Sequence, residues 1–150
     1  MADTLADREI VVTRVIDAPR DVVFAAWTER EHVEQWWLPS GGTTHEWNPQ
    51  PGGQWRYSTP GPEGAHYSFK VKFIEIAKPT RLVYDHGTDA ENAPEPVRTN
   101  VTFDDQNGKT KVTLQLVFAT AAALEEAARY GARGGAKAAL ETLAGYLARL

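Results

Sequence analysis

Few side chains in this sequence could do chemistry, and their spacing does not match most reaction types. The four histidines, His32, His45, His66 and His86, are too far apart for an H-x-H or H-E-x-x-H metal-binding pattern. The chain of 150 residues has no cysteine, which excludes thiolate chemistry and soft-metal sites. No nucleophile elbow, phosphate-binding loop or dinucleotide-binding glycine motif occurs. The spacing therefore identifies no catalytic residue, no metal site and no cofactor site.

His86 is the histidine best placed to act on a bound molecule. In the expected strand it shares the inward parity of Leu82 and Tyr84, whereas its neighbour Asp85 points to the opposite face. Asp85 therefore cannot orient His86 as a general base. Two interpretations remain: a hydrogen-bonded core histidine, or a group that orients a ligand.

Large aromatic side chains occupy inward positions of several expected strands. Because they alternate with polar neighbours, seven aromatic residues are assigned to inward-facing positions: Trp47, Trp55, Tyr57, Tyr67, Phe69, Tyr84 and Phe103. Three of the seven are tyrosines, whose hydroxyl needs a hydrogen-bond partner when it is buried. Taken singly, each could simply fill a core. As a set, they favour an aromatic chamber whose polar tips orient a bound small molecule.

The N-terminal elements are expected to close one edge of this chamber. Residues 8–16 are rich in Ile and Val and predict a strand, and residues 19–27 predict a helix with Val23 and Trp27 on one face. Thr28 and Glu31 form a T-x-x-E capping box, which predicts that a second helix starts at Thr28.

The middle of the chain has the period of a sheet. Alternating segments at residues 54–58, 67–73, 82–86, 99–103 and 111–118 predict antiparallel strands. The sequence D-Q-N-G at residues 105–108 predicts a hairpin between the last two strands, and we assign Asp104 and Asp105 to that turn. Residues 60–64 and 89–96 are expected to be surface loops.

A helical period returns over residues 121–150. Leucines recur at spacings of three and four at Leu140, Leu143, Leu147 and Leu150, so one apolar stripe should face the sheet. Glycines at residues 131, 134 and 135 predict either a helix break or close packing there. The expected fold is α+β: a curved antiparallel sheet wrapped around a long C-terminal helix, with two short helices after the first strand.

Several segments together resemble a known family. They are A-P-R-D-V-V-F-A-A-W-T at residues 18–28, the pair Trp36 and Trp37, W-N-P-Q-P-G-G-Q-W-R-Y at residues 47–57, and L-V-Y-D-H at residues 82–86. They resemble the SRPBCC superfamily, specifically the proteins similar to the activator of heat-shock-protein ATPase, which are relatives of the START lipid-transfer domains and the birch-pollen allergen. The resemblance covers residues 8–150. It implies the helix-grip fold, with a cavity between sheet and helix whose ligands and chemistries differ among members.

The resemblance also shows one departure. Members commonly have a Gly-Trp step about five residues before the first paired leucine, where this chain has Gly135 followed by Ala136. Either Ala136 enlarges the chamber, or another tryptophan fills the space. The candidate ligand-binding residues are Trp37, Trp47, Trp55, Tyr57, Tyr67, Phe69, Tyr84, His86, Phe103, Ala136 and Leu140.

Three functions fit these observations. The first is binding of a hydrophobic or aromatic small molecule, lipids included, between the sheet and the C-terminal helix. The second is an enzyme of the cyclase or hydratase kind, in which His86, Tyr84 and Tyr57 polarise a bound carbonyl. The third is a chaperone ATPase cofactor, with a chaperone partner implied by the resemblance alone. In the eukaryotic activator that activity also relies on a separate N-terminal domain, which we do not expect in this chain.

Composition limits the partners, the cellular location and the number of domains that we expect. The formal net charge of −4 and the absence of a basic stripe argue against nucleic-acid binding. The first twenty residues lack the apolar core of a signal peptide, so we expect a cytoplasmic protein without stable membrane insertion. No linker or repeat is visible, which predicts one domain over residues 1–150.

Overall fold

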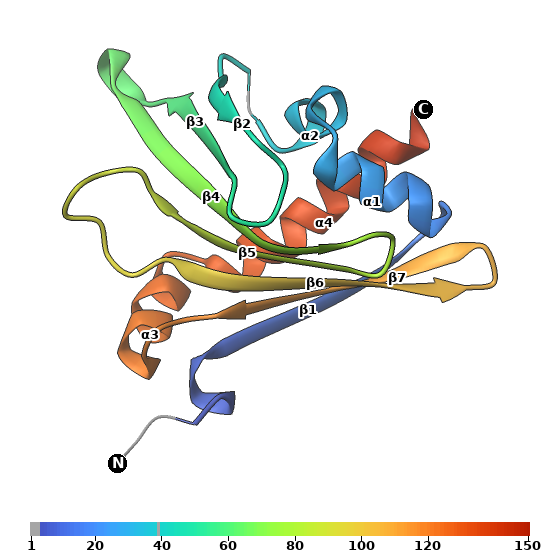
Figure 1. Cartoon of the computed structure of the whole chain (residues 1–150). Coiled ribbons are helices and arrows are strands. Elements are labelled where there is room, and N and C mark those ends of the chain that lie inside the picture. The colour runs from blue at the N-terminus through green and yellow to red at the C-terminus, as the bar shows by residue number, and fades with distance from the viewer. Residues whose placement is uncertain (1–3, 39) are drawn as a thin grey trace.

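A curved antiparallel sheet forms the body of the protein (Figure 1). The computed structural model describes residues 4–38 and 40–150, and within them seven strands pair in the order β1-β7-β6-β5-β4-β3-β2. The strands are β1 (Glu9–Ile16), β2 (Thr43–Trp47), β3 (Gln54–Pro60), β4 (His66–Ala77), β5 (Arg81–Thr88), β6 (Val97–Gln106) and β7 (Lys109–Val117). Strands β2 to β7 therefore form a meander, and β1 returns to pair with β7.

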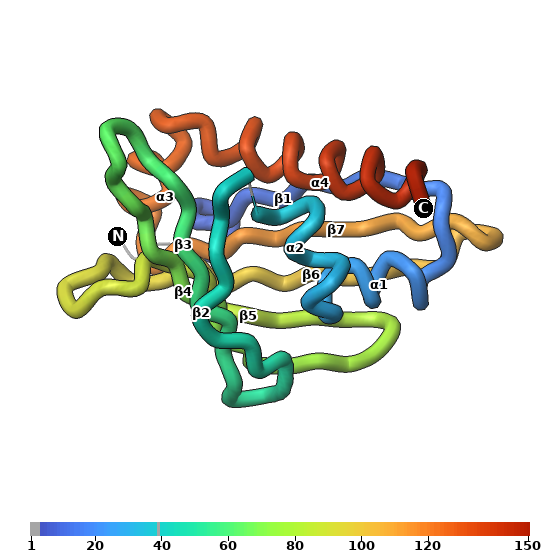
Figure 2. The backbone as a smooth tube through the Cα atoms, turned by 90° about the horizontal axis from the view of Figure 1, so that it is seen from above, coloured from blue at the N-terminus to red at the C-terminus, as the bar shows by residue number. Residues whose placement is uncertain are grey.

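Four helices of the described residues accompany the sheet: α1 (Arg20–Thr28), α2 (Arg30–Trp36), α3 (Ala121–Arg129) and α4 (Ala132–Ala148). Short 3₁₀ turns, η1 (Ala6–Arg8) and η2 (Pro62–Gly64), precede β1 and follow β3. Figure 2 shows α4 running along one face of the sheet, with α1 and α2 beside its C-terminal half. This is the α+β helix-grip architecture that the sequence predicts.

The core lies between α4 and the concave face of the sheet. The leucine stripe of α4 is buried at Leu140, Leu143 and Leu147, as its spacing predicts. Leu150 lies beyond the end of the helix and is 68% exposed, so its inclusion in the stripe is wrong. None of the helices in the described part of the chain is long and apolar enough to cross a membrane.

The helix boundaries correct two predictions. The capping box is wrong, because Thr28 is the last residue of α1 and its hydroxyl donates to the carbonyl of Phe24, four residues earlier, at 3.0 Å. Helix α2 begins at Arg30 instead, with Glu29 before it and no side-chain cap. At the C-terminal end the helix breaks at Gly131, whose φ of 82° is in the left-handed region that glycine adopts most easily.

The alternative of close packing at the other two glycines is wrong. A side-chain carbon added at Gly134 or Gly135 would meet no other atom within 4 Å. The long C-terminal helix of the prediction is therefore two helices, of which only α4 spans the sheet.

The hairpin between β6 and β7 is confirmed. Asn107 and Gly108 have positive φ, as a tight two-residue turn requires, and Asp105 accepts a hydrogen bond from the N–H of Gly108. Asp104 lies within β6 opposite Lys111, so assigning it to the turn is wrong.

Candidate functional site

A cavity of about 430 Å³ lies between α4 and the concave face of the sheet. Its aromatic wall consists of Trp27 from α1, Trp36 and Trp37 at the end of α2, and Tyr84 and His86 from β5. The remainder is Thr99 on β6, Leu114 and Leu116 on β7, and a row of short residues on α4: Gly135, Ala136, Ala138, Ala139 and Thr142. The space exists because the α4 residues that line it have no large side chain.

The end of α2 positions two of the tryptophans. Trp36 is buried, donates its indole N–H to the carbonyl of Ala26 at 2.8 Å, and meets Trp27 edge to face. These contacts fix α2 against α1. Trp37, the next residue, then lies against Tyr84 and His86, with ring centroids 6.0 and 5.6 Å away.

A chain of hydrogen bonds fixes His86. The indole N–H of Trp37 donates to Oη of Tyr57 at 3.0 Å, and Oη of Tyr57 lies 2.8 Å from Nε2 of His86. Because an indole N–H can only donate, the Tyr57 oxygen accepts from it. Which of Tyr57 and His86 donates in the second bond depends on the tautomer of the His86 ring.

Burial keeps this chain uncharged. It lowers the pKa of His86 to about 4 and raises the pKa of Tyr57 to about 12, a rise that the Trp37 hydrogen bond partly opposes. Both groups are therefore neutral near pH 7.

Two other polar groups of the cavity wall are the indole N–H of Trp27 and the hydroxyl of Tyr84. The Trp27 N–H is shielded from water and has no hydrogen-bond partner in the described part of the chain. Burial raises the pKa of Tyr84, and the Trp27 N–H opposes this rise without meeting hydrogen-bond geometry. A third polar neighbour, Thr99, pairs with Tyr84 across β5 and β6 and turns its hydroxyl towards the Val97 carbonyl at 3.5 Å.

The predicted site residues fall into three groups. Trp37, Tyr84, His86 and Ala136 line the cavity. A second group packs behind this wall or in the core and does not line it: Trp47, Trp55, Tyr57, Phe69, Phe103 and Leu140. Aromatic contacts hold part of this second group together: Trp55 meets Trp37 edge to face and Tyr57 at a tilt, and Tyr57 stacks on Phe69, with ring centroids 5.2, 4.5 and 5.3 Å apart.

Tyr67 forms the third group. It is 51% exposed, so its expected place on a dry face is wrong. The side chain lies near the start of β4, where its ring packs over the backbone of Gly61 beyond the cavity.

Several lining residues were not predicted, chiefly Trp27, Trp36, Thr99 and the members of the α4 row other than Ala136. The sequence does indicate this row, since positions 135, 138, 139 and 142 follow the i, i+3, i+4, i+7 spacing of one helix face. That face carries only Gly, Ala and Thr, so an analysis based on large apolar residues does not find it.

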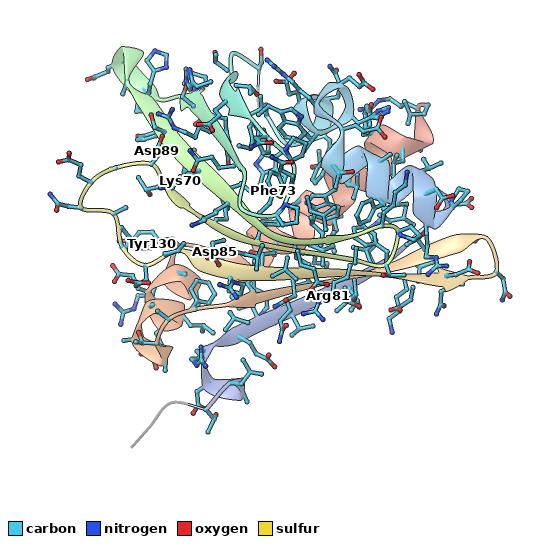
Figure 3. The ribbon with its side chains drawn as sticks, viewed as in Figure 1. Lys70, Phe73, Arg81, Asp85, Asp89 and Tyr130 are labelled. Atoms are coloured by element: carbon cyan, nitrogen blue, oxygen red, sulfur yellow. The ribbon has the colours of Figure 1, made fainter. Side chains whose placement is uncertain are left out.

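Asp85 and Asp89, which Figure 3 labels, are not among the residues that line the cavity. Asp85 binds Arg98 across β5 and β6, and Asp89 binds Arg56 at 2.8 Å. Asp85 and His86 thus face different environments, as the strand parity predicts.

One group of side chains in the described ranges could hold a metal ion: Glu29, Glu31 and His32. It lies away from the cavity, both carboxylates are exposed, and Nδ1 of His32 is bonded to the hydroxyl of Tyr146 at 2.7 Å. Nothing in the cavity wall resembles it.

Comparison with known proteins agrees with this geometry. The family described as "Activator of Hsp90 ATPase homolog 1-like protein" matches residues 17–148. The chain belongs to this family. The family is part of the SRPBCC superfamily, as the sequence resemblance indicates, and its fold is a ligand-binding one. No curated protein matches the chain.

Solved structures share the fold over nearly the whole chain. Protein Ms6760 from Mycobacterium smegmatis has a TM-score of 0.83 at 22% identity, covering 99% of this chain and 96% of that one. A protein from Arthrobacter aurescens reaches 0.86 at 21% identity, with 99% and 90% covered. A protein from Staphylococcus epidermidis has a TM-score of 0.79 at 26% identity, with 95% and 90% covered.

Proposed function

We propose that this protein binds a hydrophobic or aromatic small molecule in the cavity between the sheet and α4. One observation carries the proposal: a space of about 430 Å³ is walled by three tryptophans and by short apolar residues. That volume is in the range of small-molecule sites, roughly 300–1,000 Å³, and the mixture of apolar surface with a few polar tips is typical of them. The residues proposed to contact the ligand are Trp37, Tyr84, His86 and Ala136, together with Trp27 and Thr99.

The second candidate is an enzyme that polarises a bound carbonyl. The buried hydroxyl of Tyr84 favours it, because a hydroxyl donor in a mostly apolar cavity wall can stabilise negative charge on oxygen. His86 does not support proton abstraction near neutral pH, since its pKa of about 4 makes it a weak base. Binding is therefore the better-supported function.

A role as a chaperone cofactor rests on the family name alone, and stimulation of a purified Hsp90 ATPase would test it. The cytoplasmic location and the single domain over residues 1–150 also stay predictions. None of them bears on the cavity argument.

Two measurements test the binding proposal. Native mass spectrometry of the protein as purified should show a retained small molecule that denaturing conditions remove. Titration with N-phenyl-1-naphthylamine, a neutral fluorescent probe, should saturate at one site and quench tryptophan emission, because Trp27, Trp36 and Trp37 line the cavity. A titration without saturation at any probe concentration below aggregation would overturn the proposal.

A further inference from the structure

We infer that the ligand of this cavity is neutral and carries an acceptor oxygen, such as a ketone or ester carbonyl, that binds the Tyr84 hydroxyl and the Trp27 indole N–H. The inference rests on the proposed binding function and names its ligand class. It comes from the polar groups of the cavity wall and from the charge around them.

The wall presents donors that lack acceptors. Trp27 and Tyr84 are both 4% exposed and line the cavity. The Trp27 indole N–H interacts with the Tyr84 hydroxyl without reaching hydrogen-bond geometry, and it has no other partner among residues 4–38 and 40–150. A buried N–H or O–H group without a partner is costly, which is why such groups are rare in native proteins. A ligand oxygen placed between the two side chains would satisfy both.

His86 engages its Nε2 with the Tyr57 hydroxyl, so only its Nδ1 is left to bind a ligand, as donor or acceptor according to the ring tautomer. The hydroxyls of Thr99 and Thr142 donate to the carbonyls of Val97 and Ala138, so their protons are engaged within their own elements and their oxygens remain acceptors. The donors left in the wall are the Trp27 indole N–H and the Tyr84 hydroxyl, and an acceptor oxygen of the ligand would satisfy them.

The charge of the wall excludes an ionic ligand. Within the described chain, no Lys, Arg, Asp or Glu side chain lines the cavity, and His86 is neutral near pH 7. A carboxylate here would lie in a mostly apolar space without a cation, and an ammonium group without an anion, and burial disfavours an unpaired charge. Ion pairs such as Asp85 with Arg98 lie on the outer face of the sheet instead.

Three naphthalenes with substituents of similar shape test the inference. They are 2-acetylnaphthalene, which has a carbonyl, 2-isopropenylnaphthalene, in which a CH₂ group replaces that oxygen, and 2-naphthoate, which is anionic at pH 7.5. Equilibrium dialysis gives the affinity of each for the wild type, for Tyr84→Phe and for Tyr130→Phe. The last variant removes the same hydroxyl from a side chain that is 84% exposed and outside the cavity.

The ratio of ketone to hydrocarbon affinity is the decisive quantity, because the cost of leaving water cancels between proteins. It should fall roughly tenfold in Tyr84→Phe, the loss expected for one hydrogen bond, and stay at the wild-type value in Tyr130→Phe. The naphthoate should bind most weakly of the three to the wild type.

The outcomes separate this inference from the proposed function. Saturable binding of the ketone and the hydrocarbon with an unchanged ratio in Tyr84→Phe would overturn the acceptor-oxygen inference and leave the binding function standing. Tightest binding of the naphthoate would overturn the neutral-ligand inference alone. Failure of all three probes to saturate would overturn both.

A second measurement needs no variant. In the wild-type complex, the carbonyl stretching band of 2-acetylnaphthalene should lie at lower frequency than in a hydrocarbon solvent, because a hydrogen bond weakens the C=O bond. A band at the hydrocarbon frequency would overturn the inference even if Tyr84→Phe failed to fold.

Discussion

The hydroxyl of Tyr57 lies 2.8 Å from Nε2 of His86, although β4 separates their strands in the sheet. The bond therefore crosses over β4 on the concave face, and Trp37 completes it by donating to the same oxygen from the end of α2. One hydroxyl thus connects three segments that meet at the cavity wall. The orientation of His86 depends on this connection.

Tyr57→Phe should lower the free energy of unfolding by about 1–3 kcal/mol, because it leaves the Trp37 N–H and Nε2 of His86 without a partner. Urea unfolding at pH 7 measures the change. Tyr130→Phe is the matched control and should be neutral, since its side chain is exposed. Equal stability of the two variants would contradict a structural role for the bridge.

The stability of the protein should depend on His86 between pH 7 and pH 4.5. The pKa of His86 is about 4 when folded and about 6.5 when unfolded, so in this interval the unfolded chain binds more protons. Stability should therefore fall as pH falls, and this residue should contribute about 2–3 kcal/mol of the loss by pH 4.5. Urea midpoints should show a smaller loss in His86→Phe, and parallel losses in the two proteins would contradict the shift.

His86→Phe should also weaken ligand binding while keeping the fold. The phenyl ring fills similar space but removes the polar ring nitrogens from a residue that lines the cavity, at a cost of roughly 1–3 kcal/mol in affinity if the ligand bonds to His86. Titration of the wild type and the variant with 2-acetylnaphthalene measures the difference. Unchanged affinity would mean that His86 is a core histidine.

Ala136→Trp should fill part of the cavity. Ala136 lines that space, so the larger side chain should change the melting temperature little and should abolish saturable probe binding. Lys137→Trp is the control, because Lys137 is the next residue on α4 and is exposed. A large fall in melting temperature for Ala136→Trp alone would indicate overpacking, which typically costs about 1–3 kcal/mol, and would show that no space exists there.

Two glycines of the C-terminal region should respond in opposite ways to alanine. Gly131→Ala should cost about 1 kcal/mol, since φ is 82° and a side chain is strained there. Gly134→Ala should stabilise the protein by about 0.5–1 kcal/mol, because Gly134 lies inside α4 with open space around it. Thermal melts of the two variants measure both effects, and a shared sign would contradict the helix break at Gly131.

Strand parity explains why much of the fold could be predicted. Alternation identified the buried faces around Trp55, Tyr84 and Phe103, since a half-covered sheet enforces a period of two. It failed at Tyr67 because parity gives the face of a strand but not how far the covering helix reaches along it. The capping box failed because the hydroxyl of Thr28 could serve either helix, and the earlier one uses it.

The site was harder to predict than the fold for a related reason. An inward aromatic side chain becomes cavity wall or packed core according to the distance between α4 and the sheet, which local pattern does not specify. Tyr57 and Tyr84 have the same parity signal, yet one packs in an aromatic stack and the other lines the space. The short residues that create the space carry almost no signal of their own.

The row of short side chains on α4 separates ligand selection from folding. Gly135, Ala138 and Thr142 are exposed and line the cavity, whereas the leucines that hold α4 to the sheet point elsewhere on the same helix. A larger side chain at any of these exposed positions would reduce the cavity volume that is left for a ligand, without disturbing the core. Relatives with the same fold can therefore differ in the size of molecule they accept through a handful of substitutions on one helix, and the same positions are where the cavity of this protein would be reshaped by design.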